Sequence, residues 1–156
     1  MQKLFFLFAP LLLAVPVFAS ADKYVYDFAD PVSVVQAANR MLMNADYSAM
    51  TDITEGSERK KTDETLSAIE SDGKLLERLK QESDQIQGFE IMSTELYTNV
   101  SRAVVHTKWT VKLAQKRPSA YDTGNDRQQR LTSTVYVDYL LKPFDSRWKI
   151  ISKQTK

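Results

Sequence analysis

The chain has 156 residues, of which 43% are apolar and 26% charged, and its 21 basic and 20 acidic side chains give a formal net charge of +1. This composition is that of an ordinary globular protein, and the length suits one domain. The absence of cysteine excludes disulfides, thiolate metal sites and cysteine nucleophiles, and a single histidine excludes a histidine-rich metal cluster.

Residues 1–21 differ from the rest and predict a cleavable secretory signal. Lys3 supplies a positive charge before an apolar run over residues 4–17, which is shorter than the roughly 20 residues that a membrane-spanning helix needs. Cleavage is expected after Ala19 or Ala21, and no cysteine follows the run to anchor a lipid. We therefore expect residues 22–156 to form one exported domain, periplasmic or secreted from a bacterium, without a membrane span after cleavage.

Charge is distributed unevenly along the expected mature chain. Residues 22–100 hold 16 acidic and 8 basic side chains, whereas residues 101–156 hold 4 acidic and 12 basic ones. This asymmetry indicates either an electrostatic binding face or an acidic helical layer against a basic sheet. The mature chain has no net charge, so it lacks the basic field of nucleic-acid-binding proteins, and no nucleic acid is expected as a partner.

Helical spacing of apolar residues predicts three amphipathic helices in the first half of the chain. The first begins at Asp30-Pro31, where aspartate suits the N-cap and proline the first helical position. A short second helix follows Asp46. A third is expected from Thr62-Asp63 to about Ile86, with Gly73 as a break where its apolar stripe skips a turn. That stripe consists of Leu66, Ile69, Leu76, Leu79 and Ile86.

From Gly88 the period changes to two, which predicts four antiparallel strands. Same-face pairing of the two central strands predicts that Lys108 lies opposite Asp138. The expected fold class is α+β, with three N-terminal helices packed on a curved four-stranded antiparallel sheet. The expected strands cover residues 89–97, 102–116, 131–142 and 147–154, with a polar connection over 118–130.

This order of elements resembles the nuclear-transport-factor-2-like superfamily, in particular its small secreted bacterial members. The matching stretches are residues 38–50, where the first helix gives way to NADYSAM, and the ending DSRWKIIS at residues 145–152. The resemblance spans the mature chain and implies a cone-shaped, cystatin-like fold with a pocket at the mouth of the cone. It also implies several functions, because members include enzymes, ligand-binding proteins and dimerising or assembly domains, and a homodimer is among the expected states.

The inner face of the sheet and the second helix supply the expected pocket residues. None of them is a carboxylate or imidazole, so we expect no catalytic residue there. Glu95 is the one weak candidate, because a regular first strand would place it on the face of Phe89 and Ile91. A bulge would instead turn it outward. The expected pocket residues, which also suit a plain aromatic core, are Tyr47, Thr107, Trp109, Ser133 and Tyr139.

Polar side chains alternate onto the opposite face and predict a surface for a protein partner. This partner surface consists of Arg102, His106, Lys108, Lys112, Lys116 and Tyr136. The chain has no glycine-rich phosphate-binding loop, and we expect neither a cofactor nor a metal.

The resulting hypothesis is an exported, non-catalytic domain that recognises a protein partner or a small apolar ligand. Two alternatives stay open. One is a pocket enzyme of the hydrolase, isomerase or dehydratase type that uses Glu95 with Tyr139 or Tyr47. The other is an assembly component of an envelope secretion machine.

Overall fold

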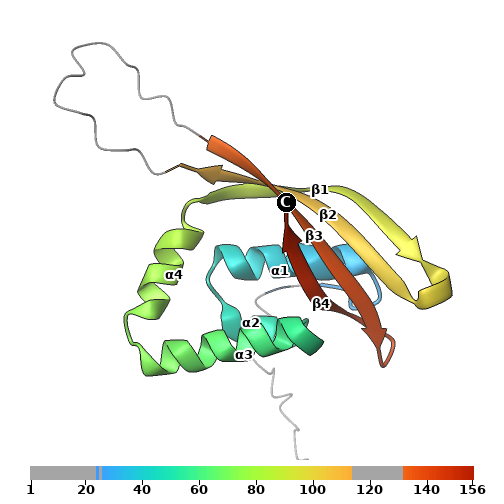
Figure 1. Ribbon diagram of the computed structural model, residues 1–156, viewed down its shortest axis with the longest axis horizontal. Coiled ribbons are helices and arrows are strands. Elements are labelled where there is room, and N and C mark those ends of the chain that lie inside the picture. Colours follow the sequence, from blue (N-terminus) through green and yellow to red (C-terminus); the bar gives the residue numbers. More distant parts are fainter. Residues whose placement is uncertain (1–23, 25, 114–131) are drawn as a thin grey trace, which may run out of the picture.

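The computed structural model describes residue 24 and residues 26–113 and 132–156 (Figure 1). The expected signal at residues 1–21, the polar connection at 118–130 and Lys116 therefore lie outside the described residues. A short 3-10 turn at Thr98–Val100 links the first two strands. The elements are α1 (Pro31–Met43), α2 (Tyr47–Met50), α3 (Gly56–Ser71), α4 (Leu75–Ser83), β1 (Ile86–Tyr97), β2 (Arg102–Lys112), β3 (Thr132–Phe144) and β4 (Arg147–Thr155).

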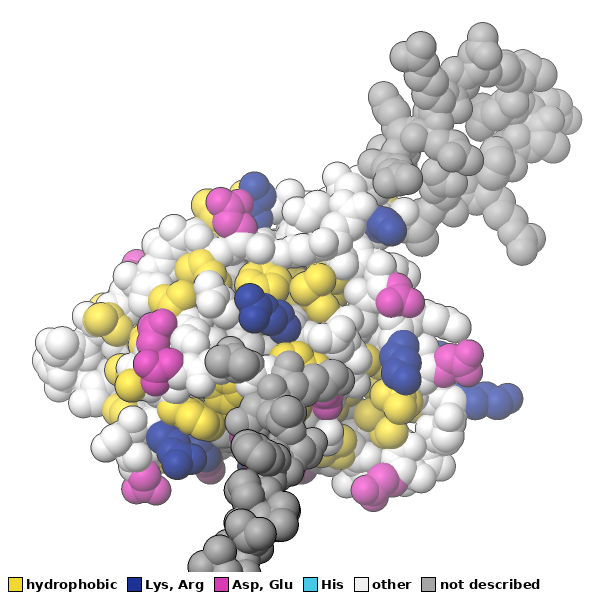
Figure 2. Space-filling view, turned by 180° about the vertical axis from the view of Figure 1, so that it is seen from behind, with side chains coloured by type: hydrophobic (Ala, Val, Ile, Leu, Met, Phe, Trp, Pro, Cys, Tyr) yellow, Lys and Arg dark blue, Asp and Glu magenta, His cyan; other side chains and the backbone are white. Residues whose placement is uncertain are grey.

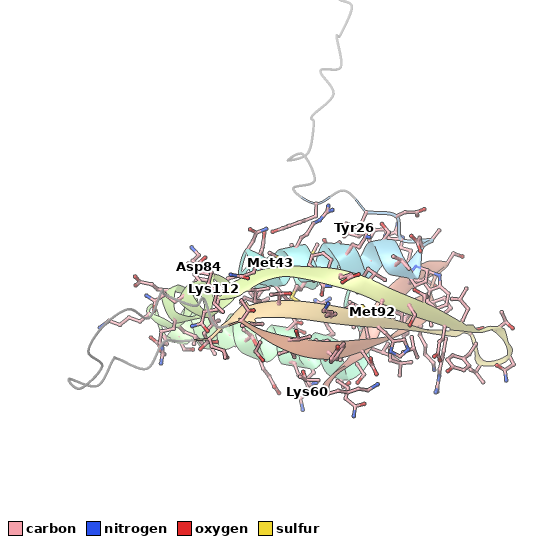
Figure 3. All side chains as sticks on the ribbon, turned by 90° about the horizontal axis from the view of Figure 1, so that it is seen from above. Tyr26, Met43, Lys60, Asp84, Met92 and Lys112 are labelled. Carbon is pink, nitrogen blue, oxygen red and sulfur yellow. The ribbon has the colours of Figure 1, made fainter. Side chains whose placement is uncertain are left out.

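The strands form one antiparallel meander in the order β1-β2-β3-β4. The sheet is strongly twisted, and the helices of the described chain gather on one of its faces (Figure 1). No helix of the described residues lies over the other face (Figure 3). The expected α+β class and four-stranded antiparallel sheet are thus confirmed.

The first two helices begin where the sequence predicts. The side chain of Asp30 accepts hydrogen bonds from the amides of Val32 at 3.0 Å and Ser33 at 3.1 Å, and Pro31 occupies the first turn. Asp46 accepts from the amide of Ala49 at 3.3 Å and caps α2 in the same way. These starts are local, because a short acidic side chain pairs with amides that have no partner inside the helix.

The expected third helix is two helices, α3 and α4, and it begins earlier than predicted. The chain first pairs with β4, where the amide of Glu55 donates to the carbonyl of Ile150 at 2.9 Å. Gly56, with φ +61°, then turns the backbone into α3. The predicted break at Gly73 is confirmed, since Asp72 ends α3 and its carboxylate accepts from the amide of Lys74 at 3.0 Å.

The core lies between α1, α2 and the inner face of the sheet. Its fully buried side chains include Val105, Leu141 and Ile150, each at most 1% exposed. On the face shown in Figure 2, apolar side chains are visible as patches among polar, charged and backbone atoms. The apolar stripe of α3 and α4 is half-buried rather than buried, and it consists of Leu66, Ile69, Leu76 and Leu79.

The register of the central strands differs from the predicted one by two residues. Asp138 lies opposite His106, and Lys108 lies opposite Tyr136. The predicted pairing of Lys108 with Asp138 is therefore wrong. Alternation fixes only which face a side chain occupies, and registers that differ by two residues keep every face unchanged.

Bulges at Met92 in β1 and Ile151 in β4 reverse the alternation of both outer strands. Each of these residues is left without a cross-strand partner where the register shifts. A bulge adds one residue, so every later side chain in the strand moves to the opposite face. Glu95 consequently lies on the outer face and Lys153 on the inner face.

Candidate functional site

Three of the five expected pocket residues are buried in the core. Thr107, Trp109 and Tyr139 expose at most 7% of their surface. The hydroxyl of Thr107 donates to the carbonyl of Val137 at 2.9 Å and accepts from the indole N–H of Trp109 at 3.1 Å. The structure thus joins Thr107 and Trp109 through their polar groups. The other two expected residues, both half-buried, are Tyr47 and Ser133.

Tyr139 reaches instead toward α1, where its hydroxyl donates to the side-chain oxygen of Asn39. Burial, and secondly the charge of Glu58, raise the pKa of Tyr139, so the phenol stays protonated. Asn39 is fully buried, and its side-chain nitrogen has no hydrogen-bond partner among the described residues. A buried amide with one unpaired end is uncommon, and it marks this part of the interior as a candidate site.

A buried acid and a largely buried amine lie near this pair. Glu58, on α3, is 5% exposed and lies 3.1 Å from the ammonium of Lys61. Lys153, on β4, is the cross-strand partner of Tyr139 and faces inward with it. Burial lowers the pKa of Lys153, the charge of Glu58 opposes that change, and the charge of Lys61 adds to it. Asn39, Glu58, Tyr139 and Lys153 are called the buried polar cluster below.

An amine with a lowered pKa beside a carboxylate and a phenol is a combination that enzymes use for proton transfer or nucleophilic attack. Ion-pair networks of purely structural value perturb pKa values in the same way. Because Glu58 exposes only 5% of its surface, we treat the buried polar cluster as a determinant of stability.

Sequence reasoning missed Glu58 and Lys153 for two different reasons. Glu58 precedes the expected start of the third helix, although its spacing of four residues from Thr62, itself 5% exposed, continues the inward stripe of α3 backwards. Alternation from Ile150 places Lys153 on the outer face, and only the bulge at Ile151 reverses that assignment. The first residue left a readable signal, and the second left none.

We expect Lys153→Met to raise the free energy of unfolding at pH 7 by about 1 kcal/mol, because burial disfavours the ammonium in the folded state. The unfolded chain binds this proton more tightly than the folded chain. Wild-type stability therefore rises with pH between the lowered pKa of Lys153 and its ordinary value of 10.5. The advantage of the variant should shrink across that window. Urea unfolding at pH 7 and at pH 10 measures both effects.

The matched control is Lys60→Met, because the Lys60 side chain is 79% exposed on α3. Its stability should change by less than about 0.5 kcal/mol. A Lys153→Met variant that is less stable than the wild type at pH 7 would mean that attraction to Glu58 outweighs the effect of burial.

The outer face carries the described residues of the expected partner surface. Arg102 and Lys112, at the two ends of β2, are exposed, and no ion pair involves either of them within the described chain. Tyr136 is 49% exposed between them on β3. Lys108 lies 3.7 Å from the carboxylate of Glu90. The surface is therefore basic at its ends and neutralised near its middle.

His106 lies at the centre of a charged network that crosses three strands. Its Nδ1 is 2.7 Å from a carboxylate oxygen of Asp138, and its Nε2 is 3.5 Å from one of Glu95. Burial works to raise the pKa of Asp138, but hydrogen bonds from Lys156 and His106 outweigh it and lower the pKa. This network links side chains of β1, β2 and β3 on the outer face.

Glu95 points outward, as the sequence analysis expected for a first strand that contains a bulge. Its side chain is 53% exposed on the outer face, away from the face of Phe89 and Ile91. A hydrogen bond from Tyr97, together with the nearby His106, lowers the pKa of its carboxyl group. Glu95 therefore stays ionised at neutral pH and does not act as a buried acid.

The described part of the chain contains no group of three or more histidine and carboxylate side chains arranged to hold a metal ion. None of its helices has both the length and the apolar character required to cross a membrane.

Comparisons with known proteins show similarity of fold alone. No family model matches the chain, and no curated protein matches it. It is similar to the solution structure of a SEC-C motif containing protein from Rhodopseudomonas palustris, with a TM-score of 0.52 and 9% identity over 82% of this chain and 80% of that one. It also matches the crystal structure of the intermembrane space region of the chloroplast protein ARC6, with a TM-score of 0.41 and 14% identity over 80% and 89% of the two chains.

Proposed function

We propose that the chain is an exported, non-catalytic binding domain whose outer sheet face recognises a protein partner. The observation that carries this proposal is a pair of exposed cations, Arg102 and Lys112, on a face over which no described helix lies (Figure 3). Among the described residues no carboxylate pairs with either of them. Tyr136 adds an exposed ring between them. Tyrosine and arginine are enriched where proteins contact one another.

The spacing of the two cations favours a protein over a small molecule. Arg102 and Lys112 stand at opposite ends of β2, ten residues apart, which corresponds to roughly 33 Å along a strand. A small ligand cannot span that distance. A partner that presents carboxylates at both ends of its surface can, and its rim charges would also speed association.

Export and the finer fold belong to the same proposal. The signal-like pattern of residues 1–21 supports export, and the proposed location of the domain is the periplasm or the outside of a bacterial cell. The twisted meander with helices on one face supports a cone-shaped member of the nuclear-transport-factor-2-like superfamily (Figure 1). The pocket-enzyme alternative loses its support, because the Glu95 side chain is 53% exposed on the outer face.

Reversing both free cations, in Arg102→Glu/Lys112→Glu, is expected to weaken binding of the partner at least about tenfold, or about 1.4 kcal/mol. The partner is identified by mass spectrometry of protein that co-purifies with the wild type, and then purified. Calorimetric titration at two salt concentrations gives the affinities. The loss should be larger at the lower concentration, because salt screens exposed charges.

The control variant is Lys60→Glu/Lys74→Glu, which reverses two exposed lysines on the helical layer. It has the same net charge as the test variant and should leave the affinity unchanged. Equal weakening by both variants, or no weakening by either, would remove the outer face from consideration.

A further inference from the structure

A recess of about 470 Å³ lies between the N-terminal segment, the connection that follows α2 and the start of β4. This volume is in the range of small-molecule sites, which usually span about 300–1,000 Å³. The recess does not belong to the outer sheet face or to the buried polar cluster. The lining residues that matter for its chemistry are Tyr26, Phe28, Asp52, Arg59, Arg147 and Lys149.

One wall of the recess is aromatic and is held in place by the backbone. The rings of Tyr26 and Phe28 lie edge to face with centroids 4.8 Å apart. The amide of Trp148 donates to the carbonyl of Phe28 at 2.8 Å, so this segment is attached to β4. The ring positions are thus set before any ligand arrives, which reduces the entropy lost on binding.

Three further lining residues carry positive charge. Arg59 donates to the carbonyl of Thr51 at 2.6 Å and lies 2.9 Å from the carboxylate of Asp63, so its position is fixed and its charge is paired. Lys149 lies 3.4 Å from Glu55. Arg147 differs from both, because no carboxylate pairs with it within the described residues.

Arg147 is nevertheless held at the aromatic wall. Its guanidinium carbon lies 4.9 Å from the centroid of the Phe28 ring, a cation–π contact. A guanidinium stacked on a ring keeps its N–H groups free at the edge, where they can bind a carboxylate through two parallel hydrogen bonds. The recess therefore presents an unpaired fork of donors next to an apolar surface.

We propose that this recess binds a small aromatic carboxylate, with the carboxylate on Arg147 and the ring against Tyr26 and Phe28. Asp52 is the acidic lining residue. Its charge disfavours ligands with several negative charges, and its oxygens can accept a hydrogen bond from a hydroxyl or amino group on the ring. A singly charged hydroxylated ligand is therefore preferred to a multiply charged anion.

The test is a calorimetric titration of the purified chain with 4-hydroxybenzoate. The expected dissociation constant is on the order of 1 mM or tighter, as suits a ligand of this size. The neutral analogue 4-hydroxybenzyl alcohol should show no saturable binding, and inorganic phosphate should bind about tenfold more weakly than 4-hydroxybenzoate. Equal binding of the neutral alcohol would overturn the role of charge, and equal binding of phosphate would overturn the role of the ring.

Variants locate the binding. Arg147→Gln should weaken binding of 4-hydroxybenzoate at least about tenfold, and Arg147→Lys should give a smaller loss because it keeps the charge without the fork. Phe28→Leu removes the ring and should also weaken binding. Lys60→Gln is the control, since Lys60 and Tyr26 lie on opposite sides of the molecule in the view of Figure 3. Unchanged affinity in folded Arg147→Gln, or no saturable binding to the wild type, would refute the proposal.

Discussion

Replacing Ile150 by alanine should lower the free energy of unfolding by about 2–5 kcal/mol, the usual range when a buried isoleucine is truncated. Ile150 is 1% exposed and packs in the centre of the core. Its backbone also joins distant parts of the chain. Its amide donates to the carbonyl of Ile53 at 2.8 Å, and its carbonyl accepts from the amide of Glu55 at 2.9 Å. The surroundings are therefore anchored and cannot close readily around the cavity.

Urea unfolding followed by circular dichroism measures this loss, with Ile69→Ala as the matched control. Ile69 lies on α3 and is only half-buried, so the same chemical change should destabilise the protein by about 1 kcal/mol. Equal losses in the two variants would show that α3 packs as tightly as β4. The assignment of the core to α1, α2 and the sheet would then be wrong.

The second large effect is expected for Tyr139→Phe, which should destabilise the protein by about 1–3 kcal/mol. The hydroxyl of Tyr139 is the donor to the side-chain oxygen of Asn39, and the Asn39 nitrogen already lacks a partner among the described residues. The variant therefore leaves a fully buried amide with neither end bonded. No hydrogen bond then compensates for the desolvation of this amide, and the cost of that desolvation accounts for the expected loss of stability.

A double-mutant cycle separates this mechanism from simple loss of packing. Asn39→Leu alone leaves the buried Tyr139 hydroxyl without its acceptor and should also destabilise the protein. The double variant Tyr139→Phe/Asn39→Leu removes both polar groups and should recover most of the loss, because replacing both partners by apolar groups is often nearly neutral. Strictly additive losses in urea unfolding would show that the hydrogen bond does not couple the two side chains.

The buried polar cluster shows how far the pattern of a sequence can reach. Tyr139 is correctly placed on the inner face by alternation alone, and so are Thr107 and Trp109. The hydrogen-bond partner of Tyr139 was not predictable, because Asn39 is one of several polar residues in a mostly apolar helix and nothing in the pattern distinguishes it. Only the packing of α1 onto β3 brings the phenol to that amide.

The same limit of prediction from alternation applies to the partner surface, on the opposite face of the sheet. Alternation correctly separates His106, Lys108 and Tyr136 from the core. It does not give the charge of the surface, because Glu90 and Glu95 come from β1, and only the bulge at Met92 turns Glu95 outward. His106 and Lys108 consequently lie beside carboxylates, and Arg102 and Lys112 are the two basic residues of this surface without an ion pair among the described residues.

By itself the sequence determined the helix starts at Asp30 and Asp46, the break at Gly73 and the two faces of β2 and β3. These features depend on contacts between residues close in the chain, or on a repeat that any half-buried strand must follow. Tertiary structure alone decided that His106 meets Asp138, that Lys153 turns inward and that α3 begins at Gly56. Register, bulges and the pairing of Glu55 with Ile150 are set by strands and loops distant in sequence, whose geometry no local pattern encodes.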